Sequence, residues 1–399
     1  MVFYLVATAV PSQRGYQRTK TIMIKLPPWW KIRRELIRPL RQLSQLPENV
    51  FTLLFGSIYF DKFKKFQEYR GLSRSSAKVA VFVIFPANKV VYSTHYRSIR
   101  FLRENGYDVI LVSNAELDKV SIDAVLPLVS KLIVRQNFGY DFGGYRQGVL
   151  DLLASDRIRV SRLLLVNDSC WFPTHYNSNF LAQAERENKD LVGLTSNFGI
   201  HRKWGTRSET DWSYSVSHKN FHYCSFFLLL SERVLYSSTF RAFWKFFPLS
   251  NRKSRVVRRG EIALTQLIIE EGFAHGEVVK VANLSVEIHA LKEQQLNDVF
   301  RHLIIMDDIE LQEEYRSLAS SRSVNRQSKE FFILKSVARQ GIPYGLLYYL
   351  CAIKEIPFLK KSPAKSSIGG LRNTLRTVEF FESEIGNEIK NELTLFRKK

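Results

Sequence analysis

Four polar segments, each placed directly after a run of apolar residues, contain the side chains that could do chemistry in this sequence. They are 86–88, 113–114, 136–144 and 167–173. The continuous apolar runs before them are typical of strands covered on both faces of a parallel sheet. Because ligands of open parallel sheets bind at the carboxyl ends of the strands, we expect the four segments to meet at one binding site.

The segment NFGYDFGGYR, residues 137–146, has the most distinctive composition. Its glycines permit close backbone approach and unusual φ angles. It lies between an expected strand and an expected helix whose N-terminal amides favour an anion. Asp141 could accept hydrogen bonds from a ribose or a base, or could instead cap the helix in a purely structural turn. Since three other segments also follow strands, we favour ligand binding.

The segment VNDSCWFP places Asp168 at the end of a buried strand, between Asn167 and Ser169. Many sugar transferases have a short acidic motif in this position, where a divalent cation bridges a carboxylate and a diphosphate. Mg²⁺ and Mn²⁺ prefer oxygen ligands and often take few of them from the protein. Asp168 is therefore a candidate metal ligand, and Asn167 and Ser169 are weaker neutral ones. Asp168 could equally hydrogen-bond the turn, which leaves the metal requirement open.

The order of apolar runs and helical patterns predicts the elements that position these segments. Strands are expected at 79–85, 107–112, 132–134, 162–166, 191–195, 221–230 and 278–284, and helices at 91–104, 144–153, 231–247 and 261–271. Strands that alternate with helices indicate right-handed βαβ units. The predicted fold is α/β, with a Rossmann-type, mostly parallel sheet flanked by helices.

Three regions are predicted: a basic, aromatic N-terminal appendage (1–77), the α/β domain (78–290) and a basic helical C-terminal region (291–399). Trp29 and Trp30 precede several basic residues, a pattern that suits a helix on an anionic membrane surface. The alternative is a helix packed on the domain with a solvated basic face. No apolar run reaches the roughly 20 residues of a transmembrane helix, and no signal peptide is expected. Translation could start at Met1 or Met23.

The overall charge narrows the classes of partner. Lys and Arg number 59 against 38 Asp and Glu, a net charge of +21, so the surface favours anions such as phosphates, an acidic membrane or nucleic acid. No nucleic-acid-binding motif is recognisable, and we expect no nucleic-acid partner. Three widely spaced cysteines, Cys170, Cys224 and Cys351, form neither a disulfide framework nor a zinc motif, which indicates a reducing compartment.

Five ordered segments carry a family resemblance. They are NFGYDFGGYRQGVLDLL, LLLVNDSCWFP, DLVGLTSN, FHYCSFFLLL and GEIALTQLIIEEGF, spread over residues 79–282. The sequence resembles the rhamnan synthesis protein F family, GT-A-like glycosyltransferases of bacterial surface polysaccharide assembly. The resemblance implies a nucleotide-sugar donor, dTDP-L-rhamnose by family, and a lipid-linked or growing glycan as acceptor. It further implies a cytoplasmic location, peripheral on the inner membrane.

The resemblance also assigns roles to residues. Glu261 stands where related enzymes often have an acidic base, which would deprotonate the acceptor hydroxyl in an inverting transfer; it could instead only favour the dipole of the helix it begins. Asp168 is the second candidate catalytic residue and the candidate ligand of Mg²⁺ or Mn²⁺. The candidate donor-binding residues are Pro86, Asn114, Asn137, Gly139, Asp141, Gly144, Asn167 and Ser169.

Candidates on the acceptor side are less specific. His222, in an expected strand, could meet the donor phosphate or the acceptor, although a locally hydrogen-bonded histidine is the alternative. Trp204 and Trp212 lie in a long loop-like stretch, where aromatic faces could stack on a sugar. Since the turn at 167–169 has one carboxylate where two are common, an inactive transferase-fold scaffold is the second interpretation of the chain. A basic nucleic-acid-binding protein is the third.

Overall fold

The computed structural model describes Val50 and residues 66–155, 158–205, 211–306, 308–321 and 324–396. Residues Thr52–Lys399 form one compact unit. Most of the expected N-terminal appendage, including Trp29 and Trp30, lies outside the described residues. Among the helices of the described ranges, none is both long and apolar enough to cross a membrane.

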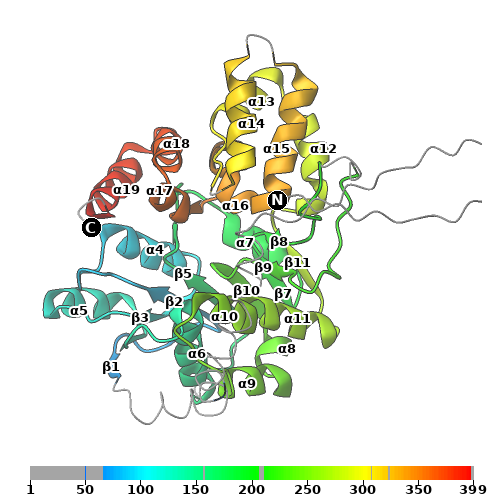
Figure 1. Cartoon of the computed structure of the whole chain (residues 1–399). Coiled ribbons are helices and arrows are strands. Elements are labelled where there is room, and N and C mark those ends of the chain that lie inside the picture. Colours follow the sequence, from blue (N-terminus) through cyan, green and yellow to red (C-terminus); the bar gives the residue numbers. More distant parts are fainter. Residues whose placement is uncertain are drawn as a thin grey trace, which may run out of the picture. The chain divides into compact units, whose positions relative to one another are not determined.

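A sheet of eight strands forms the centre of the described part of the chain (Figure 1). Its order is β1 (Gln67–Arg70), β4 (Lys131–Val134), β3 (Asp108–Ser113), β2 (Lys78–Ile84), β5 (Arg162–Asn167), β10 (Phe227–Ser231), β7 (Leu191–Gly193) and β11 (His275–Glu277). Strands β4, β3, β2 and β5 run parallel, and β10 is antiparallel to both of its neighbours. The predicted α/β fold with a mostly parallel sheet is confirmed.

Alternating side chains of β2 are buried on opposite faces of the sheet. Val79, Val81 and Val83 belong to the core beneath α6 (Tyr140–Leu153), and Phe82 belongs to the core on the other face, where α4 (Ser93–Glu104) packs. Gly148 allows α6 to lie close to the sheet, because an added Cβ would be 2.5 Å from a Val81 methyl. Burial on both faces explains the unbroken apolar run of β2.

Three expected elements differ from the structure. The strand expected at 221–230 is divided by a turn into β9 (His222–Tyr223), which pairs with β8 (Ser196–Asn197), and β10. The helix expected at 231–247 is divided because Ser237 caps a new helix by accepting from the Phe240 amide. The strand expected at 278–284 is wrong, since the Glu277 carboxylate accepts from the Val281 amide at 2.7 Å and starts a helical turn there.

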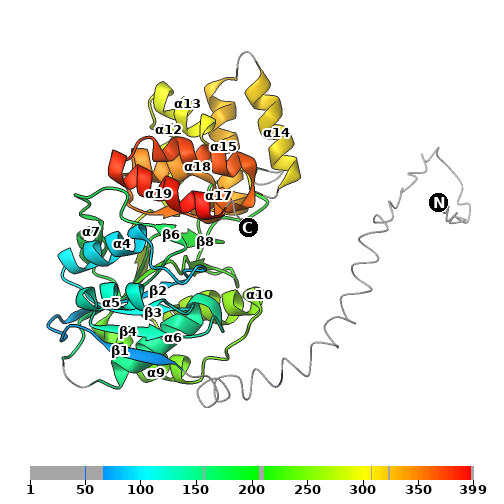
Figure 2. The same cartoon turned by 90° about the vertical axis from the view of Figure 1, so that its left-hand side faces the viewer.

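The C-terminal region is helical, as predicted, but it also adds a strand. Strand β12 (Leu359–Lys360) pairs antiparallel with β6 (Cys170–Trp171), which directly follows the turn at Asp168. Helices α17 (Ser362–Ser366), α18 (Ile368–Val378) and α19 (Ser383–Phe396) then lie beside α4 (Figures 1 and 2). Residues from both sides of position 290 therefore build the same compact unit.

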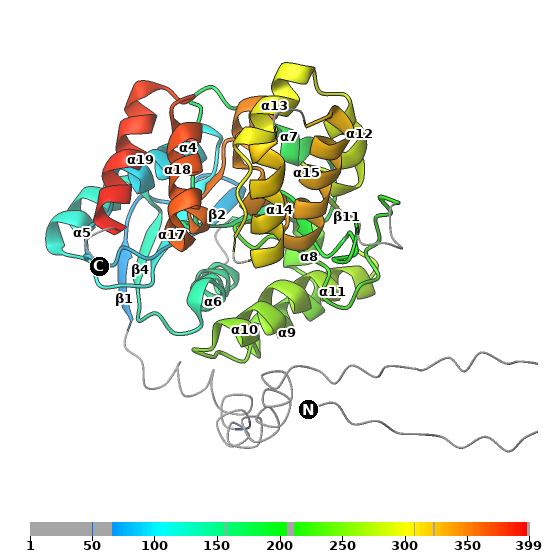
Figure 3. The same cartoon turned by 45° about the horizontal axis from the view of Figure 1, so that its top comes forward.

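The other helices are α5 (Lys119–Val125), η1 (Leu126–Leu128), α7 (Phe180–Arg186), α8 (Glu232–Leu235), α9 (Ser238–Lys245), α10 (Lys253–Val256), η2 (Val257–Ile262), α11 (Ala263–Glu270), η3 (Val281–Asn283), α12 (Leu284–His289), α13 (Glu293–Arg301), α14 (Ile309–Ser320), α15 (Arg326–Gln340), α16 (Ile342–Gly345) and η4 (Tyr349–Ile353). Some of these helices flank the sheet, and α13, α14 and α15 form a separate group beside it (Figures 1 and 3). Segment η2 is a π-helix that leads into α11 and bears Glu261.

Candidate functional site

A cavity of about 960 Å³ lies at the carboxyl ends of the central strands. Its sheet-side wall comes from all four polar segments and includes Asn88, Asn114, Asn137, Asp141 and Asp168. Parallel strands bring their carboxyl ends to one edge, so residues 80 positions apart in sequence share this wall. The four segments meet as the sequence predicts.

The opposite wall comes from the C-terminal helices, which the sequence did not place here. Lys361, Lys365, Ile368, Leu371 and Leu393 line it. The cavity is thus polar on much of the sheet side, and mixed on the helix side, where apolar side chains alternate with two lysines, two serines and Glu392. Such an enclosure, which combines polar groups with apolar cover, is typical of small-molecule sites.

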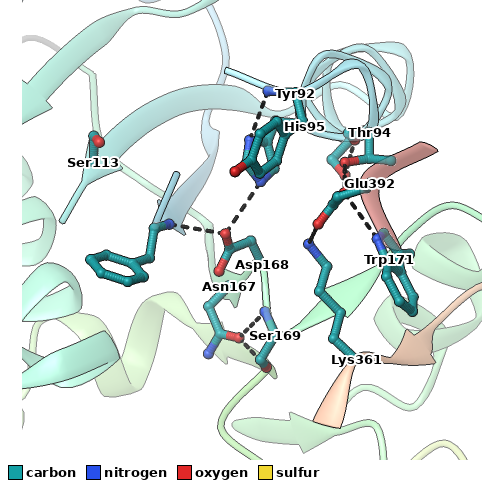
Figure 4. A network of polar contacts seen from close by, with 12 residues as sticks. Tyr92, Thr94, His95, Ser113, Asn167, Asp168, Ser169, Trp171, Lys361 and Glu392 are labelled. Atoms are coloured by element: carbon teal, nitrogen blue, oxygen red, sulfur yellow. Dashed lines mark hydrogen bonds and ion pairs between the residues drawn. The ribbon is translucent and has the colours of Figure 1, made fainter. Parts of the chain in front are cut away.

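The carboxylate of Asp168 is held in place by two donors (Figure 4). Its Oδ2 accepts from the Phe85 amide at 2.9 Å and lies 3.2 Å from Nε2 of His95. Because Nδ1 of His95 faces the Tyr92 amide at 3.3 Å as an acceptor, a neutral His95 has its proton on Nε2 and donates it to Asp168. Burial alone would raise the pKa of Asp168, but His95, Lys361 and the Phe85 amide hold it well below its usual range.

A buried ion pair fixes the C-terminal wall beside this carboxylate. Lys361 Nζ lies 2.6 Å from Glu392, and their side chains are only 5% and 3% exposed. The other carboxylate oxygen of Glu392 accepts from Thr94 of α4 at 2.5 Å and from the Trp171 indole at 2.9 Å. Figure 4 shows these groups converging on Glu392. Helices α19 and α4 and strands β6 and β12 therefore meet at one carboxylate.

Asn167 connects the Asp168 turn to α6. Its Nδ2 donates to Asp141 at 3.1 Å and to the Tyr145 hydroxyl at 2.9 Å. Its Oδ1 accepts from the Ser169 amide at 3.0 Å and from the Ser169 hydroxyl. Asn167 therefore orients its neighbours. Asp141 is the second carboxylate of the site, and burial together with the charge of Asp168 raises its pKa to about 7.

Three candidate donor-binding residues have backbone or packing roles in the structure. Gly139 adopts a φ of 85° at the start of α6, a conformation that favours glycine. Gly144 faces the sheet, where an added Cβ would be 2.7 Å from a Val83 methyl. Pro86 is buried, while its neighbours Phe85 and Ala87 line the cavity. These three residues shape the site through their backbone conformation and packing, and they are not among the residues that line the cavity.

Glu261 and His222 lie together although the sequence separates them by 39 positions. His222 Nε2 is 3.7 Å from the Glu261 carboxylate, whose side chain is 23% exposed. The other ring nitrogen of His222 lies 2.8 Å from the Asn220 carbonyl. Burial raises the pKa of Glu261, although Lys360, Ser225 and Lys253 oppose the shift. A carboxylate with a raised pKa and partial exposure can accept a proton near neutral pH.

The two tryptophans are used in packing. Trp204 is 4% exposed, and its ring meets Trp212 edge-on at 5.2 Å and Phe331 of α15 at 5.3 Å. The Trp212 indole donates to the Val281 carbonyl at 2.9 Å. Trp204 is therefore buried and not available to stack on a sugar, whereas Trp212 is partly exposed and its role in acceptor binding stays a prediction.

The residues of the cavity suit a divalent cation only with help from a ligand. The described residues contain no group of three or more His, Cys, Asp or Glu that could hold a metal ion. Asp141 and Asp168 supply two carboxylates, and the pKa of Asp141 is raised partly by the charge of Asp168, which a cation between them would offset. Mg²⁺ and Mn²⁺ commonly take one or two carboxylates plus phosphate and water oxygens. The donor set therefore fits a cation completed by a diphosphate.

Comparison with known proteins finds a matching family. A family model described as rhamnan synthesis protein F matches residues 109–305. The predicted resemblance to the rhamnan synthesis protein F family is confirmed. The match supports a glycosyltransferase-type function. It includes Asp141, Asp168 and Glu261, whereas His95 and Lys361 lie outside it.

Individual relatives cover different parts of this chain. It is 30% identical to the uncharacterized protein y4gN of Sinorhizobium fredii over 198 residues, which are 50% of this chain and 47% of that protein. The chain thus spans about half the length of this relative. It is 26% identical to the virulence protein VirA of Vibrio anguillarum over 306 residues, 76% of this chain and 84% of VirA.

Solved structures overlap only weakly with this chain. Core-mannan synthase A (CmsA/Ktr4) of Aspergillus fumigatus, in its Mn/GDP form, has a TM-score of 0.28 and 8% identity over 50% of this chain and 72% of that one. A putative nucleotide-diphospho-sugar transferase of Desulfovibrio desulfuricans has a TM-score of 0.26 and 10% identity over 56% and 91%. At these scores, neither similarity defines the substrate.

Proposed function

We propose that the cavity binds the nucleotide diphosphate of a nucleotide-sugar donor and that the protein transfers the sugar to a glycan acceptor. The observation that carries this proposal is the placement of Asp168, held by His95 and the Phe85 amide at the end of β5, beside Asp141 of α6. Asn88, Asn114 and other polar side chains of the neighbouring strand ends offer partners for a nucleoside.

Glu261 is the proposed base. The acceptor oxygen attacks the anomeric carbon, the bond from that carbon to the diphosphate oxygen breaks with its electron pair, and the hydroxyl proton passes to Glu261. One such carboxylate suffices for an inverting transfer. His222 lies 3.7 Å away, and burial lowers its pKa, so it is neutral near pH 7. Its Nδ1 then donates to the Asn220 carbonyl, and its Nε2 has no proton to donate to Glu261.

A divalent cation, Mg²⁺ or Mn²⁺, would be held by Asp168 and Asp141 and would supply positive charge to the diphosphate. The protein's own side chains orient these two carboxylates and cover the cavity. Asn167 fixes Asp141 toward the turn, His95 fixes Asp168, and the C-terminal helices limit the access of water to the cavity.

The family match supports a finer assignment. We infer dTDP-L-rhamnose as the donor and a lipid-linked or growing bacterial surface polysaccharide as the acceptor. A protein with this acceptor would work at the cytoplasmic face of the inner membrane, and the net charge of +21 favours contact with an anionic surface.

Calorimetry with dTDP, UDP and GDP, each with and without Mn²⁺, tests donor binding. At least one diphosphate should bind, and Asp141→Ala should weaken that binding; unchanged affinity would remove Asp141 from the site. If no diphosphate binds, the scaffold interpretation is favoured. Transfer of labelled sugar from a donor panel to lipid-linked acceptors tests the activity. There, Glu261→Gln should abolish transfer and leave donor affinity intact, and full activity of this variant would exclude Glu261 as the base.

A further inference from the structure

Lys360 is hydrogen-bonded to a residue that lines the donor cavity, and nothing in its local sequence marks it. It is the second residue of β12, where it pairs with Cys170 of β6. Its ammonium donates to the Ser169 hydroxyl at 2.8 Å, and Ser169 lines the cavity beside Asp168. The antiparallel pairing of two short strands thus brings a cation to the end of β5 from 191 positions along the chain.

The surroundings of Lys360 hold its charge in place without cancelling it. The ammonium lies 4.4 Å from the ring centre of Phe226 and 5.9 Å from that of Tyr344. No carboxylate among the described residues is within salt-bridge distance of it, whereas neighbouring Lys361 is paired with Glu392. An ammonium has three N–H donors, so two remain available beyond the bond to Ser169.

The charge of Lys360 acts on both parts of the site. Burial lowers the pKa of Lys360, but Cys170, Tyr344, Cys224 and Glu261 together outweigh burial and raise it, so the side chain is cationic. The same charge opposes the raised pKa of Asp141 and of Glu261. Lys360 is therefore close enough to influence the donor carboxylate and the base at once.

We propose that the Lys360 ammonium is a catalytic group that binds the donor diphosphate and neutralises the charge it gains as the sugar leaves. This inference rests on the proposed transferase function. As the bond between the anomeric carbon and the diphosphate oxygen breaks, its electron pair stays on that oxygen, and the diphosphate gains one negative charge. A fixed cation at this point stabilises the transition state more than the ground state.

The decisive measurement compares nucleoside diphosphates with monophosphates. Calorimetry on the full chain would use the pairs dTDP/dTMP, UDP/UMP and GDP/GMP with the wild type, Lys360→Met and Lys360→Arg. We expect Lys360→Met to lower diphosphate affinity roughly 10- to 100-fold, the range for a hydrogen bond to a charged group. In Lys360→Met, monophosphate affinity should stay the same and kcat for sugar transfer should fall. Lys360→Arg should recover part of the lost diphosphate affinity and part of the lost kcat.

A matched control is Lys354→Met, which removes a lysine six positions earlier that pairs at the surface with Glu287. It should leave the preference for diphosphate intact. Equal loss of diphosphate and monophosphate affinity in Lys360→Met would mean that Lys360 only supports Ser169, and would overturn the proposal. The proposal would also be overturned if Lys360→Arg and Lys360→Met both kept the wild-type preference for diphosphate over monophosphate. If the wild type binds none of the nucleotides, the transferase function itself fails.

Discussion

The buried pair Lys361–Glu392 should contribute strongly to stability, and its removal tests how the C-terminal helices are attached. Glu392→Gln keeps the shape of the side chain, so Thr94 and Trp171 can still donate to an oxygen, but it takes from the buried Lys361 ammonium its ion-pair partner and leaves only the more distant charge of Asp168. The two side chains are 5% and 3% exposed. At that depth, removal of one charge of a pair costs about 3–5 kcal/mol of unfolding free energy.

Glu392→Ala should lower the unfolding free energy by more than Glu392→Gln does. It also leaves the Thr94 hydroxyl and the Trp171 indole without their acceptor, and an unsatisfied buried donor costs about 1–3 kcal/mol. The experiment belongs at pH 7. The pKa of Glu392 is lowered, chiefly by Lys361 against the effect of burial, so the stabilisation is present above the unfolded pKa of Glu and is lost as the pH falls through the folded value.

Urea unfolding followed by circular dichroism measures the loss, with the double variant Lys361→Met/Glu392→Met beside each single one. The double variant should be less destabilised than the sum of the singles, because neither charge is left alone. The exposed pair Lys89–Glu116, with side chains 62% and 79% exposed, is the control, and its removal should change stability little because water screens it. A loss for Glu392→Gln no larger than that of the control would refute a strongly stabilising buried pair.

Three further predictions follow from single contacts. Burial raises the pKa of Glu277 to about 7, so its contribution to stability should be lost as the pH rises from about 4.5 to 7, by at most about 3 kcal/mol. Glu277→Gln should make this fall smaller, while Asp141, whose pKa is also raised to about 7, still contributes to it; a wild-type stability that does not change over this range contradicts the prediction. His95→Gln should weaken diphosphate binding about tenfold, because it removes a hydrogen bond that holds Asp168. If His95 has only a packing role, calorimetry would show the same diphosphate affinity for this variant and the wild type. Gly148→Ala should lower thermal stability by about 1–3 kcal/mol, unlike Gly369→Ala, whose added Cβ meets nothing within 4 Å.

The sheet and the sheet-side wall of the cavity could be predicted because their signal is local. Strands buried on both faces appear as unbroken apolar runs, and the polar residues after them must share an edge. Asp141 and Asp168 were found in this way. The pattern cannot distinguish a glycine that borders a ligand from one that lets a helix pack closely on the sheet. Gly144 lies against the sheet and belongs to the latter group.

The helix-side wall could not be predicted because it depends on pairing over long separations. Strand β12 has two residues, too few for any periodicity. Glu392 looked like one more charge on an amphipathic helix, and only tertiary packing buries it. Trp204 shows the reverse case, since aromatic residues in a loop suggested a sugar platform and instead fill the core against α15.

The orientation of Asn167 has a consequence for how such a site can evolve. Its amide donates to Asp141 and accepts from Ser169, which in turn accepts from Lys360. An aspartate at 167 would have no donor for Asp141 and would put a third carboxylate beside it. An amide at this position therefore satisfies both neighbours, and a second carboxylate here would need a compensating change in α6 or β12.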